Sequence, residues 1–171
     1  MTKRVIVIGA GAAGLIAAGR AAEVGAEVIL LEKMAEAGKK ILVSGQERCN
    51  ITNSAPVEKF LEHYGRNGQF LRNAYHRFFR NELLALLARY GVETQEERGG
   101  RIFPASGRAG DVRDALLRYA TTQGTAIRYR TEVQRILVAD GEVIGVQLQN
   151  GEHIPAHAVI LATGGASWPT T

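Results

Sequence analysis

The fold is decided near the start of the chain by the stretch VIVIGAGAAG, residues 5–14. The apolar, β-branched residues 5–8 predict a strand buried on both faces of a parallel sheet. Gly9, Gly11 and Gly14 form a GxGxxG pattern between this strand and a helical run. In such a pattern the first glycine permits a tight turn, the second lets a pyrophosphate reach the backbone, and the third allows close helix–strand packing. The motif therefore predicts a dinucleotide phosphate site at a helix N-terminus.

A second strand and an acidic residue extend this pattern. Residues 27–31 form another apolar run, so the opening of the chain predicts a βαβ unit. Glu32 follows eighteen residues beyond Gly14, where a carboxylate can accept hydrogen bonds from the hydroxyls of an adenosine ribose and disfavours a 2′-phosphate. The alternative is a glycine-rich turn with no ligand, and the agreement of strand, turn, helix and acid argues against it. The fingerprint alone does not separate NAD from FAD.

The remaining segments predict a long insertion and a meander. Residues 33–53 have neither helical nor strand periodicity and predict a functional loop. Residues 56–122 predict mostly helices, with Asn81 as an N-cap and two short strands within residues 92–103. Extended segments at residues 126–139, 143–149 and 153–154, separated by Asp-Gly and Asn-Gly turns, predict an antiparallel meander of three strands at about 126–155.

These elements predict an α/β, Rossmann-like fold with three layers. Its central parallel sheet would contain the strands near residues 5 and 28 and a last apolar run at residues 158–161, with helices on one face and the meander on the other. We expect one FAD/NAD(P)-binding domain over residues 1–171, with a mostly helical excursion at about 56–122 that forms a flap or satellite, and the meander at about 126–155.

Composition narrows the class of protein. The chain is 46% hydrophobic and 22% charged, and no apolar run approaches the roughly 20 residues of a membrane helix. With no secretory signal pattern and the single cysteine Cys49, we expect a cytoplasmic protein without disulfides or a metal site. The net charge of +4 has a local source, because residues 66–118 contain ten arginines and no lysine. A solvated arginine-rich surface is the favoured interpretation, and nucleic-acid binding the weaker one.

Four segments carry a resemblance to a known family. They are residues 7–14; residues 38–45 (GKKILVSG) with residues 48–53 (RCNITN); residues 100–104 (GRIFP); and residues 162–165 (ATGG) with Ser167 and Pro169. On these segments the chain resembles the BaiN/RdsA-type family of NAD(P)/FAD-dependent oxidoreductases. It departs from the family pattern at Gln46-Glu47, where the family usually has two glycines.

The resemblance implies a set of cofactor-binding residues. It implies pyrophosphate contacts at the glycine motif, adenosine contacts at Glu32 and Lys33, a backbone contact to the adenine at Val133, and further FAD contacts at Lys40 and in the loop from Gly45 to Asn53. The full set of expected cofactor-binding residues is Gly9, Gly11, Ala13, Gly14, Glu32, Lys33, Lys40, Gly45, Arg48, Asn53, Val133, Ala162, Thr163 and Gly164.

The resemblance also implies a reaction. We expect the FAD-binding part of a flavoprotein that passes a hydride from NAD(P)H through FAD to an acceptor, a small molecule or an RNA base, at a C=C bond. Family members are longer, so the expected fold and flavin site are incomplete here. Apolar surface would then be left uncovered, so we expect either self-association or marginal stability. The alternative is a catalytically inactive Rossmann-like fragment with weak or no dinucleotide binding. No residue is assigned a catalytic role.

Overall fold

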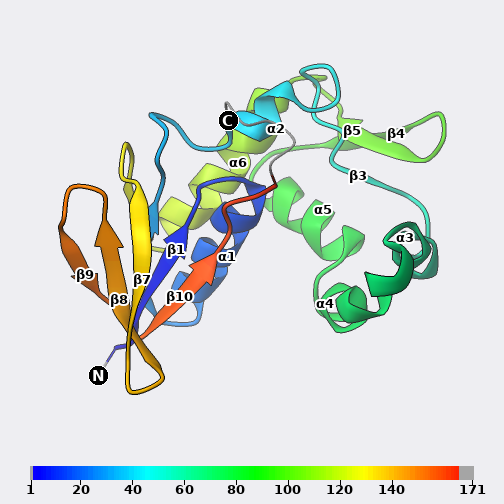
Figure 1. The fold of residues 1–171 in the computed structure, drawn as a ribbon. Coiled ribbons are helices and arrows are strands. Elements are labelled where there is room, and N and C mark those ends of the chain that lie inside the picture. The colour runs from blue at the N-terminus through cyan, green and yellow to red at the C-terminus, as the bar shows by residue number, and fades with distance from the viewer. Residues whose placement is uncertain (1, 166–171) are drawn as a thin grey trace. The chain divides into compact units, whose positions relative to one another are not determined.

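The computed structural model describes residues 2–165, and the motif residues Ser167 and Pro169 lie outside this range. The described chain forms two compact units, one built from residues 2–42 and 116–165 and the other from residues 43–115. Figure 1 gives the course of the chain and the labels used below. No helix of the described residues is long and apolar enough to cross a membrane.

A parallel sheet forms the centre of the first unit. Its strands are β1 (Arg4–Ile8), β2 (Glu27–Leu31), β6 (Ala126–Arg128) and β10 (Ala158–Leu161), in the order β10-β1-β2-β6. All three neighbouring pairs are parallel, and three of the strands, β1, β2 and β10, are the apolar runs from which the parallel sheet was predicted.

Helices cover one face of this sheet. Helix α1 (Ala12–Glu23) connects β1 to β2, and its C-terminal turn is closed by Gly25 at φ +92°. The C-terminal part of α6 (Ala109–Thr122) packs on α1, where a Cβ added at Gly19 would lie 2.5 Å from the ring of Tyr119. The phenol of Tyr119 donates a hydrogen bond to the Glu23 carboxylate at 3.0 Å. The missing side chain at Gly19 therefore lets the two helices approach closely.

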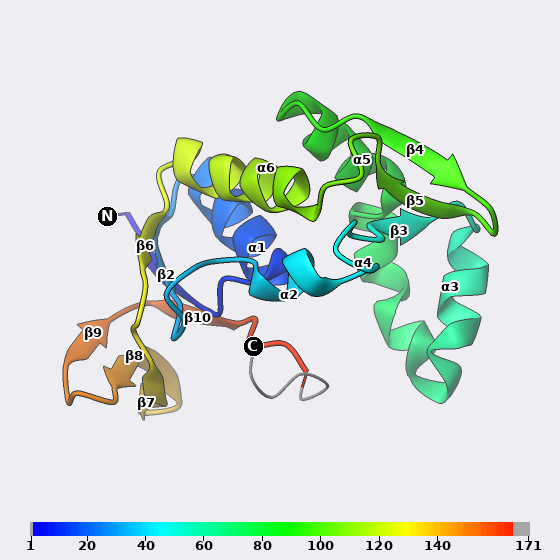
Figure 2. The same ribbon diagram turned by 90° about the horizontal axis from the view of Figure 1, so that it is seen from above.

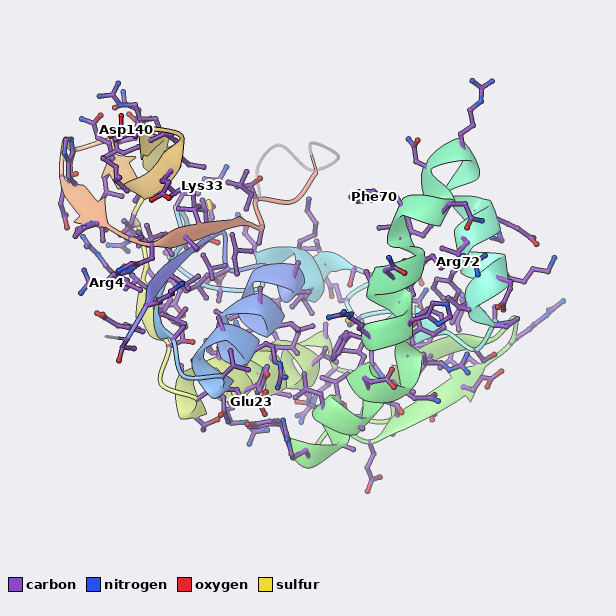
Figure 3. All side chains as sticks on the ribbon, turned by 90° about the horizontal axis from the view of Figure 1, so that it is seen from below. Arg4, Glu23, Lys33, Phe70, Arg72 and Asp140 are labelled. Carbon is purple, nitrogen blue, oxygen red and sulfur yellow. The ribbon has the colours of Figure 1, made fainter. Side chains whose placement is uncertain are left out.

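The β-meander covers the other face, as Figure 2 shows. It consists of the antiparallel strands β7 (Val133–Ala139), β8 (Glu142–Leu148) and β9 (His153–Pro155). Asp140, at φ +51°, forms the tight turn between β7 and β8 with Gly141 (Figure 3). The sheet and the meander share a core of buried residues, namely Ile6, Leu31, Val146, Leu148, Ile154 and Ala156. The predicted α/β architecture with helices, parallel sheet and meander is confirmed.

One strand was placed in the wrong sheet by the sequence pattern. Residues 126–139 were expected to form a single meander strand, but β6 pairs with β2 in the parallel sheet and only β7 belongs to the meander. The chain breaks between them, with Arg130 at φ +51°. Backbone hydrogen bonds from Arg130 to Met34 and from Thr131 to Glu32 hold the break.

The second unit holds the insertion. Short helices α3 (Val57–His63), η1 (Gly65–Leu71) and α4 (Arg72–Arg77) precede α5 (Arg80–Arg89), and an antiparallel sheet has the order β3 (Thr52–Asn53), β5 (Arg101–Pro104), β4 (Thr94–Glu97). Helix α2 (Lys39–Val43) spans the boundary between the units.

The start of α5 corrects another expectation. Asn81 lies inside the helix rather than at its N-cap, which is Phe79. The Glu82 carboxylate accepts a hydrogen bond from the backbone amide of Phe79 at 2.9 Å, which lowers the pKa of Glu82. A glutamate in the first turn thus supplies the capping oxygen that the asparagine was expected to supply.

Candidate functional site

A pocket of about 310 Å³ opens at the carboxyl ends of β1 and β2. In open parallel sheets of this kind, ligands bind in the crevice outside the carboxyl ends of the strands. The pocket lies entirely within the first unit. Nine residues expected from the sequence line it, namely Gly9, Gly11, Glu32, Lys33, Lys40, Val133, Ala162, Thr163 and Gly164.

The three glycines of the motif differ in what surrounds them. A Cβ at Gly9, which has φ +98°, would lie 2.6 Å from the carbonyl oxygen of Ala162. A Cβ at Gly14 would lie 1.8 Å from the carbonyl oxygen of Gly9. A Cβ at Gly11, in contrast, would meet no protein atom within 4 Å. Packing of the protein therefore requires Gly9 and Gly14, whereas the space at Gly11 opens toward the pocket.

The start of α1 supplies the polar groups of the phosphate site. Gly11 is the N-cap residue of the helix and has no side chain with which to cap it. The helix has no acidic residue in its first turn, so its own side chains place no negative charge beside the site. Ala13 and Gly14 lie in this first turn and are not among the residues that line the pocket. Their expected contact with a pyrophosphate would be made through backbone amides.

Glu32 is held in place by main-chain donors. Glu32 is the residue directly after β2, and it is only 9% exposed. One carboxylate oxygen, Oε2, accepts a hydrogen bond from the amide of Ala10 at 2.7 Å, and the other, Oε1, accepts one from the amide of Met34 at 2.8 Å. A carboxylate oxygen can accept more than one hydrogen bond, so both oxygens retain capacity for the hydroxyls of a ribose.

Lysines lie at the rim of the pocket. Lys33 is exposed beside Glu32, and Figure 3 labels its side chain. Lys40 donates a hydrogen bond from Nζ to the carbonyl oxygen of Gly165 at 3.1 Å, which joins α2 to the turn after β10. These cations give the pocket groups that can neutralise phosphate charge.

Several pocket residues were missed by the sequence analysis. Thr131 and Glu132 line the pocket from the break between β6 and β7, and Met34 and Glu36 line it from the loop after β2. Gly38 also lines it and donates a backbone hydrogen bond to Ala10 at 2.8 Å. Gly38 was part of the GKKILVSG motif, and the only sequence signal for Met34 and Glu36 was their position in the loop after β2. Thr131 and Glu132 had no signal, because residues 126–139 were expected to be extended.

Three expected site residues belong to the second unit, namely Gly45, Arg48 and Asn53. Asn53 uses both ends of its amide locally, donating from Nδ2 to the carbonyl of Gly99 at 2.8 Å and accepting at Oδ1 from the amide of Ala55 at 2.9 Å. Arg80 donates to the carbonyl oxygens of residues 53–55. These bonds fix the backbone that follows the loop.

Arg48 is bound on two sides within its own unit. Its two terminal nitrogens donate to the two carboxylate oxygens of Glu97 at 2.8 and 3.0 Å. Its guanidinium also lies 4.2 Å from the ring centroid of Phe103. The hydrogen bond with Glu97 raises the pKa of Arg48, and the same bond is the largest cause lowering the pKa of Glu97. Both groups are therefore charged at neutral pH.

The backbone around Arg48 is left-handed. Gly45, Gln46 and Glu47 have φ of 57°, 56° and 67°, and Cys49 has φ of 61°. Such a conformation costs a residue other than glycine about 1–2 kcal/mol, and it is found mostly as single residues. Gly45 is required here, because a Cβ would lie 2.5 Å from the amide nitrogen of Asn50. Strain of this kind persists only where the surrounding structure holds it.

Cys49 is buried within this turn. Burial raises the pKa of its thiol, so the reactive thiolate is disfavoured. Among the residues that the structure describes, no group of three or more His, Cys, Asp and Glu side chains is placed to hold a metal ion.

The fold and the pocket define a Rossmann-like domain of the FAD-binding type. The chain belongs to the family described as the HI0933-like protein Rossmann domain, whose model matches residues 3–171. The resemblance found in the sequence motifs is thereby confirmed.

Two curated relatives come from this group. The chain is 38% identical over 165 residues to a 3-dehydro-bile acid delta(4,6)-reductase of Clostridium scindens. This alignment covers 95% of the chain and 39% of that relative. It is 33% identical over 167 residues to a ribosomal RNA dihydrouridine synthase of Haemophilus influenzae, covering 96% of the chain and 41% of that relative. The chain thus spans about two fifths of the length of these relatives.

Solved structures share the fold. A 3-ketosteroid-delta4-(5alpha)-dehydrogenase from Rhodococcus jostii matches with a TM-score of 0.71 at 21% identity, over 95% of this chain and 46% of that one. At this level of identity the match speaks for the fold alone.

Proposed function

We propose that the pocket of the first unit binds the ADP half of FAD. The observation that carries this proposal is the pairing of an open position at Gly11 with a buried, main-chain-anchored carboxylate at Glu32. The first leaves room for a pyrophosphate at the start of α1, and the second presents oxygen acceptors at the end of the neighbouring strand. A volume of about 310 Å³ is at the lower end for small-molecule pockets and suits part of a dinucleotide.

Each part of the pocket would meet a different part of the cofactor. The α1 amides at Ala13 and Gly14 would hold the pyrophosphate, with Lys40 as a partner for its charge. Glu32 would accept hydrogen bonds from the ribose, and Val133 at the start of β7 would lie against the adenine. A bound flavin supplies the hydride chemistry, and these residues bind and orient it.

The proposed reaction of the whole protein is hydride transfer from NAD(P)H through FAD to an acceptor with a C=C bond. The names of the two relatives support this class, since one describes a reductase of a bile acid and the other the formation of dihydrouridine in RNA. A small molecule and an RNA base therefore both remain acceptor candidates. A cytoplasmic location and self-association stay predictions.

The test is a titration of the purified chain with FAD, followed by flavin absorbance and fluorescence. We expect saturable binding with about one flavin per chain, and loss of that binding in Gly11→Ala. If neither this chain nor a longer chain that spans the full length of its relatives binds FAD, the proposal is wrong. If the flavin binds, anaerobic addition of NADH and then NADPH tests the donor, since bleaching of the bound flavin reports its reduction.

A further inference from the structure

The left-handed turn at residues 45–49 is an unusual feature of the second unit. Gln46, Glu47 and Cys49 all have positive φ, although none is glycine. Two backbone bonds close the turn, from Arg48 to the carbonyl of Gly45 at 3.3 Å and from Cys49 to that of Ser44 at 3.0 Å. A cluster of unfavourable backbone conformations needs contacts elsewhere that hold it, and such clusters concentrate at functional sites.

Arg48 is placed to make the contacts that stabilise this backbone conformation. It lies between Glu47 and Cys49, and its guanidinium forms a two-pronged ion pair with Glu97 of β4. Phe103 of β5 lies beneath the guanidinium, at 4.2 Å from its ring centroid. Because β4 and β5 are paired strands, the two partners form one rigid support. A planar guanidinium with two parallel hydrogen bonds and a stacked ring has a fixed orientation.

Two further contacts couple the turn to its unit. The carbonyl of Glu47 accepts a hydrogen bond from the amide of Ala109 at 3.2 Å, and the amide of Ile51 donates to Ile102 of β5 at 2.8 Å. Cys49, the last residue of the turn, is buried, with 6% of the residue exposed. Of these contacts, only those of Arg48 combine charge, two hydrogen bonds and stacking.

We infer that Arg48 is a positioning residue, which holds the left-handed turn through Glu97 and Phe103 and does not itself bind the cofactor. Glu97 binds one edge of its guanidinium and Phe103 lies against one of its faces, so the side chain is held in an orientation toward β4 and β5. Its contribution to FAD binding would be indirect, through the shape of the turn. This second step rests on the proposed function.

Glu97→Gln tests the first step without any cofactor. The substitution keeps the size of the side chain but removes its charge and one of the two acceptor oxygens. We expect the amides of Arg48 and Cys49 to exchange hydrogen about tenfold faster, measured by mass spectrometry on peptides that cover residues 44–50. Peptides from β1 and β10 should be unchanged. The matched control is Glu93→Gln, an exposed carboxylate of the same unit.

A rescue experiment separates positioning from general stability. Glycine adopts positive φ at no steric cost, so Gln46→Gly with Glu47→Gly should keep the turn closed even without the ion pair. When these changes are added to Glu97→Gln, we expect the exchange rate to return close to that of the wild type. An unchanged exchange rate in Glu97→Gln, or the absence of rescue, would overturn the role of Arg48.

The FAD titration tests the second step on the same variants. We expect Glu97→Gln to weaken FAD binding about tenfold, and the two glycines to restore it. Faster exchange with unchanged FAD affinity would overturn the link to the cofactor. If neither the wild-type chain nor the longer chain binds FAD, the proposed function and this link both fail, whereas the exchange rates still decide whether Arg48 holds the turn.

Discussion

The carboxylate of Glu32 and the backbone amide of Ala10 are joined by a 2.7 Å hydrogen bond between the ends of β2 and β1. Ala10 is fully buried, so its amide has no access to water. The side chain that is proposed to hold the ribose therefore also accepts the hydrogen bond of a buried amide in the glycine turn, which is proposed to hold the phosphates. Structure and binding are coupled at this one residue.

Glu32→Ala should consequently lower both stability and FAD affinity. The change leaves the amides of Ala10 and Met34 without their acceptor, which costs about 2–3 kcal/mol when a buried donor loses a charged partner. Glu32→Gln keeps one oxygen and should be intermediate. Urea unfolding measures the first effect and flavin fluorescence the second. Equal urea midpoints for Glu32→Ala and wild type would contradict this account.

Substitutions at two glycines of the motif should separate an effect on stability from an effect on FAD binding. Gly14→Ala places a methyl 1.8 Å from a backbone oxygen, so we expect a loss of about 3 kcal/mol in the free energy of unfolding. Gly11→Ala meets no protein atom and should cost at most about 1 kcal/mol, mainly from its N-cap position. FAD binding should nevertheless fall more than tenfold in Gly11→Ala. Thermal unfolding and FAD titration on both variants give the comparison, and normal FAD affinity in Gly11→Ala would place the phosphates elsewhere.

Relief of the left-handed turn should stabilise the protein. Gln46→Gly and Glu47→Gly each remove about 1–2 kcal/mol of backbone strain and each cost about 0.5–1 kcal/mol in chain entropy. The expected net gain is about 0.5–1 kcal/mol for each variant, measured by urea unfolding. Gln46→Ala is the control, because alanine keeps the restriction on φ and should give no gain. A loss of stability in both glycine variants would show that the turn is not strained.

Tyr75 should titrate well above an ordinary tyrosine. Burial, together with the hydrogen bond that its phenol donates to Tyr64 at 2.9 Å, raises its pKa to about 12. The folded state keeps this proton where the unfolded state, with a pKa near 10, has lost it. The contribution to stability is therefore fully present below about pH 10 and declines as the pH rises toward 12.

The measurement for Tyr75 is NMR on protein labelled at the tyrosine ring carbon, with Tyr75→Phe for assignment. Tyr64→Phe removes the acceptor of the hydrogen bond and should lower the pKa of Tyr75 without returning it to 10, since burial remains. A Tyr75 resonance that titrates near pH 10 in the wild type would refute the expected shift.

The sequence was most informative where a local pattern alone determines the position of a residue. Gly9, Gly11 and Glu32 follow buried strands directly, so strand pattern and motif spacing together predicted the pocket that they line. The two hairpin turns likewise predicted the meander from a local pattern. Asp140-Gly141 adopts the positive φ that such turns require.

The sequence was least informative where partners far along the chain determine how a strand pairs or what a side chain contacts. β6 is only three residues long and carries no mark of whether it pairs with β2 or continues into β7. The partners of Arg48 lie on β4 and β5, so no local pattern could show that its guanidinium is already bound. Gln46 and Glu47 themselves carry no signal of positive φ, which is normally indicated by glycine, and the one indication was that the resembled family usually has two glycines here.

The order of the parallel sheet has a consequence for how the protein is made. Strand β1 pairs with β10, and the amide of Arg4 meets a ring nitrogen of His157, 153 residues further along the chain. At ribosomal speeds of about 5–20 residues per second, roughly eight to thirty seconds separate the synthesis of these two neighbours. During that interval the backbone N–H and C=O groups on this edge of β1 lack the strand with which they pair in the fold. We therefore expect the nascent chain to depend on chaperones, and the purified chain to refold slowly, as contacts of such high sequence separation require.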